Sequence, residues 1–487
     1  MRWKTTLILL AATVGLGAYL SLYEIRQPPP EERARLTQQI VRVNPETVTQ
    51  LTLTLPQTNV TWQRDGATWR LTPQQWRADP TRVQTLLSLL RPLLAERTLT
   101  ASTDHPLDLP SYRLDPAIGS LSVTGSEAPV TLRFGEATAV GGNRYARVDG
   151  RPEVFVIPAG LFDAANQPVE QFRDPVLLRV DPWHANGLTV TMLEGSFTLT
   201  RSERMWQVAS SVPTGPQASA AAPWTDVADR AEVNSLLQRV GDIAIARFLE
   251  EPPQADSVAG VGLDQPQMTL VLQQQDAEPV TVVIGAPLPD DRSLLYATRS
   301  DESTRYAISQ ATVETLSRDA HGLRSKRCFD FFTSEVTKVE VGREQTRWLI
   351  QRSQDQWKAQ GEEAPLDQER VEQFLDELGD LSLSGFVDDA PASLSAYGLE
   401  PPAGTISVWT IGEAPVQRLL VGSAIDNSSN RYGRIDGRPA VVRLPEAASD
   451  LLAKTLESLR TPAPSQAQPA LHPIGTGTSP PPAAPSK

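Results

Sequence analysis

The sequence predicts an α+β fold, in which an N-terminal transmembrane helix precedes three tandem repeats of mixed antiparallel strands with one long and one short helix each. Three observations support this prediction. An uncharged apolar stretch lies near the start of the chain, one sixteen-residue phrase occurs twice with ten identities, and helix and strand patterns recur around it in a fixed order. Repetition at a fixed period is typical of a tandem architecture.

The N-terminal stretch, residues 5–23, contains nineteen residues and no charge, and Arg2 and Lys4 precede it. A helix of that length reaches about 29 Å, close to the thickness of the hydrocarbon layer. Because the basic residues precede the stretch, we expect residues 1–4 in the cytoplasm and the bulk of the chain in the periplasm or otherwise extracytoplasmic. The prediction is a single-pass anchor in the bacterial inner membrane.

A cleaved signal peptide is the alternative interpretation of the same residues. Its apolar region is usually shorter and ends in a small-x-small site, whereas YLSLY precedes Glu24 in this chain. We therefore favour a retained anchor. Residues 24–40 contain three consecutive prolines and would act as a stiff spacer after the anchor.

Three segments of the chain share the same order of short motifs. The repeated phrase is NRYARVDGRPEVFVIP from Asn143 and NRYGRIDGRPAVVRLP from Asn430. An apolar strand with one glycine precedes each copy, and a third version, VVIGAPL with Gly285, lies between them without the complete phrase. The motifs further upstream are YRLDPA, VGLDQP and YGLEPP, and one tryptophan precedes the helix of each unit: Trp69, Trp206 and Trp357.

These spacings divide the chain into three repeat units of roughly 140 residues. The predicted boundaries are 41–178, 179–328 and 329–460, with a loop insertion at about 212–224 in the second unit, where Pro, Ala and Ser predominate. Residues 461–487 are rich in Pro, Ala, Ser and Gly. We expect a disordered tail there, because this composition buries too little apolar surface to fold.

Each unit begins with alternating strands, continues with a long helix and ends with further strands and a short helix. In the first unit, Asp65-Gly66 predicts a hairpin between NVTWQR and ATWRLTP. The following helix begins at a cap, Asp79, before Pro80. Its apolar face is expected to contain Val83, Leu86, Leu87, Leu90, Leu93 and Leu94.

The repeated phrase is itself predicted to be a hairpin. Asp149-Gly150 and Asp436-Gly437 separate two apolar strands in each copy, and Asp-Gly is typical of a tight type I′ turn. This structural role explains most of the phrase. Its polar side chains could also contact the acidic surface of a partner or the phosphate of a glycan, and the alternative is a solvated strand face. The candidate contact residues are Asn143, Arg144, Arg147, Asn430, Arg431 and Arg434.

The composition argues against nucleic acid as a partner. The chain contains 45 Lys and Arg against 58 Asp and Glu, which gives a net charge of −13, and no basic stripe runs along it. The one cysteine, Cys328, permits no disulfide within the chain. A small buried apolar group is a simpler interpretation of this thiol than a nucleophile.

No motif for catalysis, metal binding or cofactor binding occurs in the sequence. The four histidines are scattered without zinc-ligand spacing, and there is no nucleophile elbow, phosphate loop or dinucleotide fingerprint. The oxygen-rich residues 426–430 lack the alternating carboxylates of a calcium loop. We therefore predict a protein that is not an enzyme and that holds no metal and no cofactor.

The motif order resembles a bacterial family catalogued as domain of unknown function 4340 (DUF4340). The shared features are the basic-flanked span, W-x-L, Y-G-L-D/E-P, an apolar strand with glycine and Y-x-R-x-D-G-x-P-x-V-F-x-I-P, over about residues 41–460. Members of that family are often encoded beside gliding-motility-type ABC exporters. The resemblance therefore implies an auxiliary envelope subunit of such a transporter, and it carries over no catalytic residue.

These features lead to two main functional hypotheses. The first is a non-enzymatic accessory protein, anchored in the inner membrane, that contacts the membrane subunits of an ABC-type export or envelope complex. The alternative is an extracytoplasmic protein that binds glycan or modifies cell wall or polysaccharide. That function requires carboxylates or arginines from distant segments to converge in a cleft. Self-association through the repeat units is a third hypothesis.

Overall fold

The computed structural model describes residue 3 and residues 39–460, apart from 92, 103–105, 126–127, 140, 204, 212–222, 250–260, 318, 345, 362–364 and 413–415. The predicted anchor at residues 5–23, nearly all of the predicted spacer, most of the predicted insertion and the predicted tail at 461–487 lie outside these residues. Within the described part of the chain, the structure contains no helix long and apolar enough to cross a membrane.

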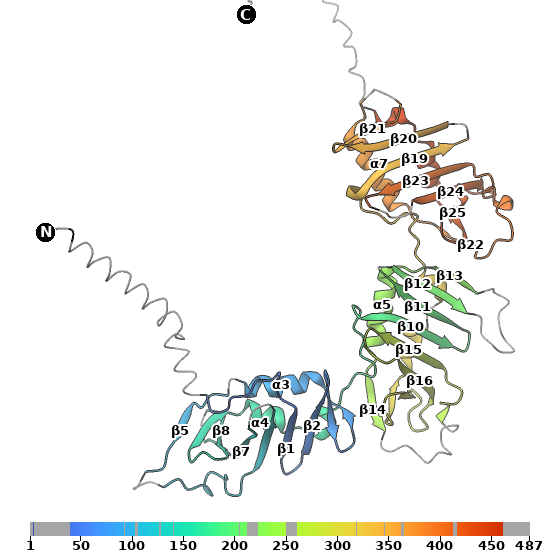
Figure 1. The fold of residues 1–487 in the computed structure, drawn as a ribbon. Helices are drawn as coiled ribbons and strands as arrows, with labels where there is room; N and C mark the ends of the chain where they lie inside the picture. The colour runs from blue at the N-terminus through green and yellow to red at the C-terminus, as the bar shows by residue number, and fades with distance from the viewer. Residues whose placement is uncertain are drawn as a thin grey trace, which may run out of the picture. The chain divides into compact units, whose positions relative to one another are not determined.

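The first repeat forms a nine-stranded antiparallel sheet in the order β4-β3-β2-β1-β6-β7-β8-β9-β5 (Figure 1). The strands are β1 (Gln50–Thr54), β2 (Asn59–Asp65), β3 (Thr68–Thr72), β4 (Trp76–Arg77), β5 (Arg97–Leu99), β6 (Gly119–Thr124), β7 (Val130–Ala137), β8 (Asn143–Val148) and β9 (Val154–Pro158). The helices are α3 (Pro80–Leu90), α4 (Gly160–Ala165) and the 3₁₀ helix η2 (Val169–Phe172). Leu51 and Leu53 of β1 share one buried core with Leu86 of α3 and Phe162 of α4.

The second repeat has the same strand order, β13-β12-β11-β10-β15-β16-β17-β18-β14. The strands are β10 (Ala185–Met192), β11 (Gly195–Ser202), β12 (Met205–Ser211), β13 (Trp224–Val227), β14 (Ile245–Leu249), β15 (Met268–Gln274), β16 (Val280–Pro287), β17 (Leu294–Arg299) and β18 (Arg305–Ser309). The helices are α5 (Arg230–Gly241), α6 (Gln310–Leu316) and the 3₁₀ helix η5 (Ala320–Leu323).

The third repeat forms an eight-stranded antiparallel sheet in the order β21-β20-β19-β23-β24-β25-β26-β22. The strands are β19 (Val336–Arg343), β20 (Thr346–Ser353), β21 (Gln356–Ala359), β22 (Gly385–Asp388), β23 (Gly404–Thr410), β24 (Gln417–Ala424), β25 (Arg431–Ile435) and β26 (Val441–Leu444). The helices are α7 (Gln368–Asp380), α8 (Glu446–Ala453) and the 3₁₀ helices η6 (Thr333–Glu335), η7 (Ser395–Tyr397) and η8 (Leu456–Leu459). The described residues contain no counterpart of the edge strands β4 and β13 in this sheet.

The three tandem repeats, each a mostly antiparallel sheet with helices, confirm the predicted repeat architecture. By internal packing the chain divides into two compact units, one of residues 1–181, 238–269 and 280–316 and the other of residues 182–237, 270–279 and 317–487. The first unit contains the first repeat together with β14 and β16 to β18. The second unit contains β10 to β13 together with the third repeat.

Helix α3 confirms the predicted cap but is shorter than the predicted apolar face. Oδ1 of Asp79 accepts a hydrogen bond from the Thr81 N–H at 2.8 Å, so the carboxylate caps the helix as expected. The helix ends at Leu90, and Leu94 instead forms an isolated bridge with Gln39. The sequence has proline at position 92, and proline has no N–H to donate to the carbonyl four residues earlier. This explains the early end, although Arg91 itself keeps helical dihedrals of φ −56° and ψ −48°.

The turns of the repeated phrase differ from the type I′ geometry expected of Asp-Gly. Gly150 and Gly437 have φ of +80° and +79°, but neither Asp149 nor Asp436 has a positive φ. The N–H of Arg151 donates to Val148 O at 3.1 Å and closes a four-residue turn with glycine at its third position. A positive φ at that position alone is typical of a type II turn, so the I′ prediction is wrong.

The glycine shared by the three repeats is explained by a close backbone approach. A Cβ at Gly135, Gly285 or Gly422 would lie 2.3–2.4 Å from a carbonyl oxygen of the loop that carries the YRLDPA, VGLDQP or YGLEPP motif. In all three repeats this position lies at a shift of strand register, where the sheet bulges. The glycine therefore allows the upstream loop to dock onto the sheet in each repeat.

Candidate interaction site at the repeated hairpins

The predicted contact residues Arg144 and Arg431 form hydrogen bonds within their own repeats. Arg144 Nη1 donates to the carbonyl O of Gly135 at 2.5 Å, and Arg431 Nε donates to that of Gly422 at 2.9 Å. The guanidinium carbon of Arg144 lies 3.6 Å from the ring centroid of Phe162. Burial lowers the pKa of Arg144 below its ordinary value. Both arginines thus satisfy a carbonyl that the bulge removes from the strand ladder.

The predicted contact residues Arg147 and Arg434 stabilise the hairpin turns. Nε of Arg147 donates to the carbonyl O of Arg151 at 3.2 Å, and Nε of Arg434 donates to that of Arg438 at 3.2 Å. The same bond therefore spans the turn in the first and third repeats. It fixes the backbone of the residue that follows the Asp-Gly pair.

The predicted contact residues Asn143 and Asn430 also form local bonds. The side chain of Asn143 donates through Nδ2 to Oε2 of Glu96. The backbone carbonyl of Asn430 accepts a hydrogen bond from the Ile425 N–H at 3.0 Å. The six candidate residues thus form two groups, one on β8 and one at β25, in separate repeats. Contact of these residues with a partner stays a prediction.

The tyrosine of each phrase packs against the upstream motif. Tyr145 lies 4.6 Å from Tyr112 between ring centroids, and Tyr432 lies 5.1 Å from Tyr397. Tyr112 begins YRLDPA and Tyr397 begins YGLEPP. The two most recognisable motifs of the sequence therefore contact each other inside one repeat, as structural elements would.

A joint between successive repeats lies in the second compact unit, around the buried carboxylate of Asp226 on β13. Arg438 Nε donates to Oδ1 of Asp226 at 2.6 Å, and Arg438 Nη2 donates to Oδ2 at 2.8 Å. Arg324 Nε donates to the same Oδ2 at 2.7 Å. The side chains of Asp226 and Arg324 are 0% and 1% exposed, so water does not screen these charges.

The arginines of this joint have further partners. Arg438 Nη2 donates to the carbonyl O of Ser325 at 2.8 Å. Arg324 Nη1 donates to Oδ1 of Asp389 at 2.5 Å, and its guanidinium carbon lies 3.5 Å from the ring centroid of Phe386. Two guanidinium groups thus face two carboxylates, and this balance offsets the cost of burying them.

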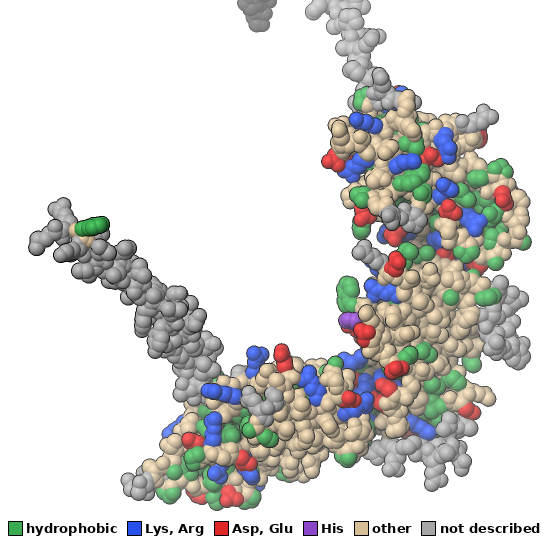
Figure 2. Space-filling model, in the orientation of Figure 1, with side chains coloured by type: hydrophobic (Ala, Val, Ile, Leu, Met, Phe, Trp, Pro, Cys, Tyr) green, Lys and Arg blue, Asp and Glu red, His purple; other side chains and the backbone are tan. Residues whose placement is uncertain are grey.

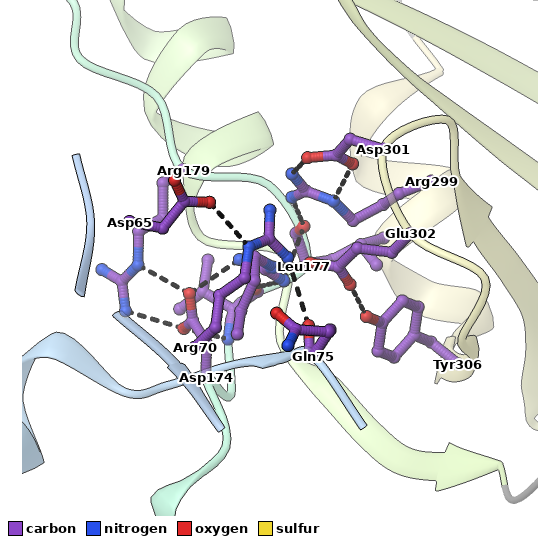
Figure 3. Close-up of polar contacts among 12 residues, drawn as sticks. Asp65, Arg70, Gln75, Asp174, Leu177, Arg179, Arg299, Asp301, Glu302 and Tyr306 are labelled. Carbon is purple, nitrogen blue, oxygen red and sulfur yellow. Dashed lines mark hydrogen bonds and ion pairs between the residues drawn. The ribbon is translucent and has the colours of Figure 1, made fainter. Parts of the chain in front are cut away.

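A second joint lies in the first compact unit (Figure 3). Arg77 on β4 has Nη1 2.7 Å from Oδ2 of Asp174 and Nε 2.6 Å from Oε1 of Glu302. Arg179 donates to both oxygens of Asp174, at 2.7 and 2.9 Å. The hydroxyl of Tyr306 donates to Oε2 of Glu302. Burial and the charge of Glu302 raise the pKa of Tyr306, which keeps this hydroxyl protonated as a donor.

Arg299 and Asp301 complete this joint. Arg299 donates to Oδ1 and Oδ2 of Asp301 at 2.9 and 2.7 Å, and its Nη1 donates to the carbonyl of Leu177. Burial alone would raise the pKa of Asp301, but the hydrogen bond and charge of Arg299 hold that pKa below its ordinary value. Three guanidinium groups and three carboxylates again balance.

The two joints occupy equivalent positions of the repeat with opposite polarity. Glu302 follows the β17–β18 turn, and Arg438 follows the β25–β26 turn. Each reaches the edge strand of the preceding repeat, where Glu302 meets Arg77 on β4 and Arg438 meets Asp226 on β13. The strand supplies the cation in one joint and the anion in the other. The residue after the turn is therefore opposite in charge to the residue of the edge strand that it meets.

Sequence reasoning missed the joints, although one signal was present. Arg438 belongs to the DGRP part of the repeated phrase, as Arg151 does, but it was not among the candidate contact residues. Its partner Asp226 lies 212 residues away in the sequence and carries no motif. Only the fold brings the two together.

The first-repeat hairpin has the same construction at its tip. Arg133 pairs with Asp149 at 2.5 Å, and Arg151 follows the turn with an exposed side chain. Among the residues that the structure describes, the Arg151 guanidinium group has no carboxylate partner, and its ring contact is with Phe155 of the same hairpin at 5.9 Å. This is the position held by Arg438 in the third repeat.

The other candidate groups take no part in the joints. Burial raises the pKa of the Cys328 thiol to about 12, so the thiolate is scarce at neutral pH. In the described part of the chain, no three His, Cys, Asp or Glu side chains form a group that could hold a metal ion. A hollow of about 510 Å³ in the third repeat is lined by Glu377, Asp380 and Asp450 among others.

Comparison with known proteins gives a family and no activity. The family model described as "Domain of unknown function (DUF4340)" matches residues 69–227, 218–363 and 359–470. No curated protein matches the chain. A putative DNA polymerase III beta subunit from Eubacterium rectale is 8% identical, with 85% of this chain and 97% of that chain covered, but its TM-score of 0.19 supports no inference. Because three consecutive family matches cover most of the sequence, the protein belongs to the DUF4340 family.

Proposed function

We propose that the protein is a non-enzymatic accessory protein of the bacterial inner membrane, an auxiliary subunit of an ABC-type, gliding-motility-like export or envelope complex. Residues 5–23 would anchor it, with residues 1–4 in the cytoplasm and the repeats in the periplasm or otherwise extracytoplasmic. The apolar, uncharged sequence of this stretch supports the anchor. The transporter as partner is supported by the likeness of the motifs to the DUF4340 family.

The observation that favours a docking role is the construction of the two joints. In each, a hairpin tip meets a sheet edge of the preceding repeat through a buried ion cluster, and in the Asp226 joint this contact is also hydrogen-bonded. Such charge pairs favour one partner over others, because a mismatched charge would be buried without compensation. The hairpins of the second and third repeats thus dock onto a preceding sheet, and Arg151 of the first-repeat hairpin has no carboxylate partner among the described residues.

Affinity capture of the full chain from membranes in mild detergent tests this function. We expect stoichiometric recovery of membrane subunits of an ABC-type complex, with an unrelated single-span protein carrying the same tag as control. Recovery of the chain alone would contradict the proposal. Retention on immobilised cell-wall glycan, without protein partners, would favour the alternative of a glycan-binding protein.

A further inference from the structure

We infer that the tip of the first-repeat hairpin, Arg151 supported by Arg147, is a docking surface for a partner protein that presents a carboxylate on the edge strand of a sheet. This inference rests on the proposed accessory function and assigns it a surface. It follows from the contacts of the equivalent hairpins and from the charge at the tip.

The equivalent hairpins show what this element binds. In the third repeat, Arg438 forms a bidentate pair with Asp226 on β13, an edge strand of the second-repeat sheet. In the second repeat, Glu302 pairs with Arg77 on β4, an edge strand of the first-repeat sheet. Two of the three hairpins therefore bind an edge strand by one charged side chain of opposite sign.

The first hairpin is preorganised in the same way as the third. The Arg147 bond to Arg151 O and the Arg434 bond to Arg438 O both measure 3.2 Å. Gly150 and Gly437 have φ of +80° and +79°. The turn and the arginine hydrogen bond across it are the same in both hairpins. Binding at Arg151 therefore requires little ordering of the backbone, which favours affinity.

The charge of Arg151 selects an acidic partner. A guanidinium group binds a carboxylate through two parallel hydrogen bonds, as Arg438 does with Asp226. On the face drawn in Figure 2, basic and acidic side chains are interspersed, so that face carries no broad field of one sign. Recognition would depend on this one local pair.

The described residues of a second copy offer no free carboxylate at the equivalent position. The carboxylate of Asp226 on β13 is bonded by Arg324 and Arg438 of its own chain. Strand β4 carries Arg77 instead, and the described part of the third repeat contains no counterpart of these edge strands. We therefore assign the edge strand to another protein.

Site-specific photo-crosslinking in the full-length, membrane-integrated protein tests the inference. A benzophenone side chain replaces the exposed Pro152, next to Arg151, in three versions of the chain: unchanged, Arg151→Glu and Arg343→Glu. Arg343 is an exposed strand arginine of the third repeat and serves as the matched control. We expect one crosslinked product whose partner peptide, identified by mass spectrometry, contains an Asp or Glu on an edge strand.

The yield should fall roughly tenfold in Arg151→Glu and stay unchanged in Arg343→Glu, because only the former places like charges together. Changing the identified carboxylate to Lys should restore crosslinking to the Arg151→Glu chain. An equal yield with Arg151→Glu, a product made of two copies of the chain, or an adduct with lipid would each overturn the inference. An unchanged melting temperature of both variants excludes misfolding as the cause.

The same variants separate this inference from the proposed function. If the Arg151→Glu chain still captures ABC-type subunits at the level of the unchanged chain, the accessory function stands and this docking surface is wrong. If the unchanged chain captures none, the proposed function fails as well.

Discussion

Individual charged residues connect the repeats of this protein. Asp226 has no exposed side-chain surface and relies on Arg324 and Arg438 for compensation. Removing one partner of a buried pair leaves a charge without a counterion, which costs about 3–5 kcal/mol. The joints therefore concentrate a large part of the coupling between repeats in a few side chains.

Arg77→Ala tests this at the other joint. The change leaves Asp174 with Arg179 alone and removes the arginine from Glu302, so we expect the free energy of unfolding in urea to fall by about 3–5 kcal/mol. Arg343→Ala, at an exposed position, should change it by less than about 0.5 kcal/mol. Equal effects of the two substitutions would show that the cluster contributes little.

Asp301 gives the second joint, which contains Arg77 and Glu302, a dependence on pH. Its folded pKa is depressed, so its contribution to stability is complete above the unfolded pKa of about 3.9 and is lost as the pH falls through the lower folded value. The stability difference between the unchanged chain and Asp301→Asn should therefore be largest near neutral pH and shrink below about pH 4. Urea midpoints measured from pH 6 to pH 2.5 check this. A difference that stays constant over that range would contradict the assignment.

At the scale of secondary-structure elements, the sequence could predict what local chemistry determines. The cap at Asp79, the hairpin of the repeated phrase and the aligned glycine strands all depend on neighbours in the chain, and the structure contains them. The end of α3 and the turn type were predicted wrongly. The proline at position 92 lacks the N–H that would continue the helix, and in the turns only the glycine of Asp-Gly has a positive φ.

The shared glycine gives a prediction for an element. Gly422→Ala would place a methyl group 2.3 Å from the carbonyl oxygen of Tyr397, so we expect a loss of about 1–3 kcal/mol in the free energy of unfolding. Gly385→Ala serves as control, because nothing lies within 4 Å of its added Cβ. A smaller loss for Gly422→Ala than for Gly385→Ala would show that the upstream loop does not dock as described.

At the scale of the whole molecule, three copies of one fold are joined by pairs of opposite polarity. The hairpin carries Glu302 where the strand carries Arg77, and it carries Arg438 where the strand carries Asp226. Exchanging the hairpins would place like charges together, so the sequence also disfavours the wrong order of repeats. The motif pattern predicted three units, but a contact 212 residues apart cannot be read from local pattern.

The most direct test of this account is a double-mutant cycle on Asp226→Asn and Arg438→Gln in the full chain. If the third-repeat hairpin is joined to β13 by this pair, the two effects on the free energy of unfolding should be coupled by about 2 kcal/mol or more. The control cycle, Asp226→Asn with Arg343→Gln, should be additive within about 0.5 kcal/mol. Additivity in the Asp226 and Arg438 cycle would contradict the joint.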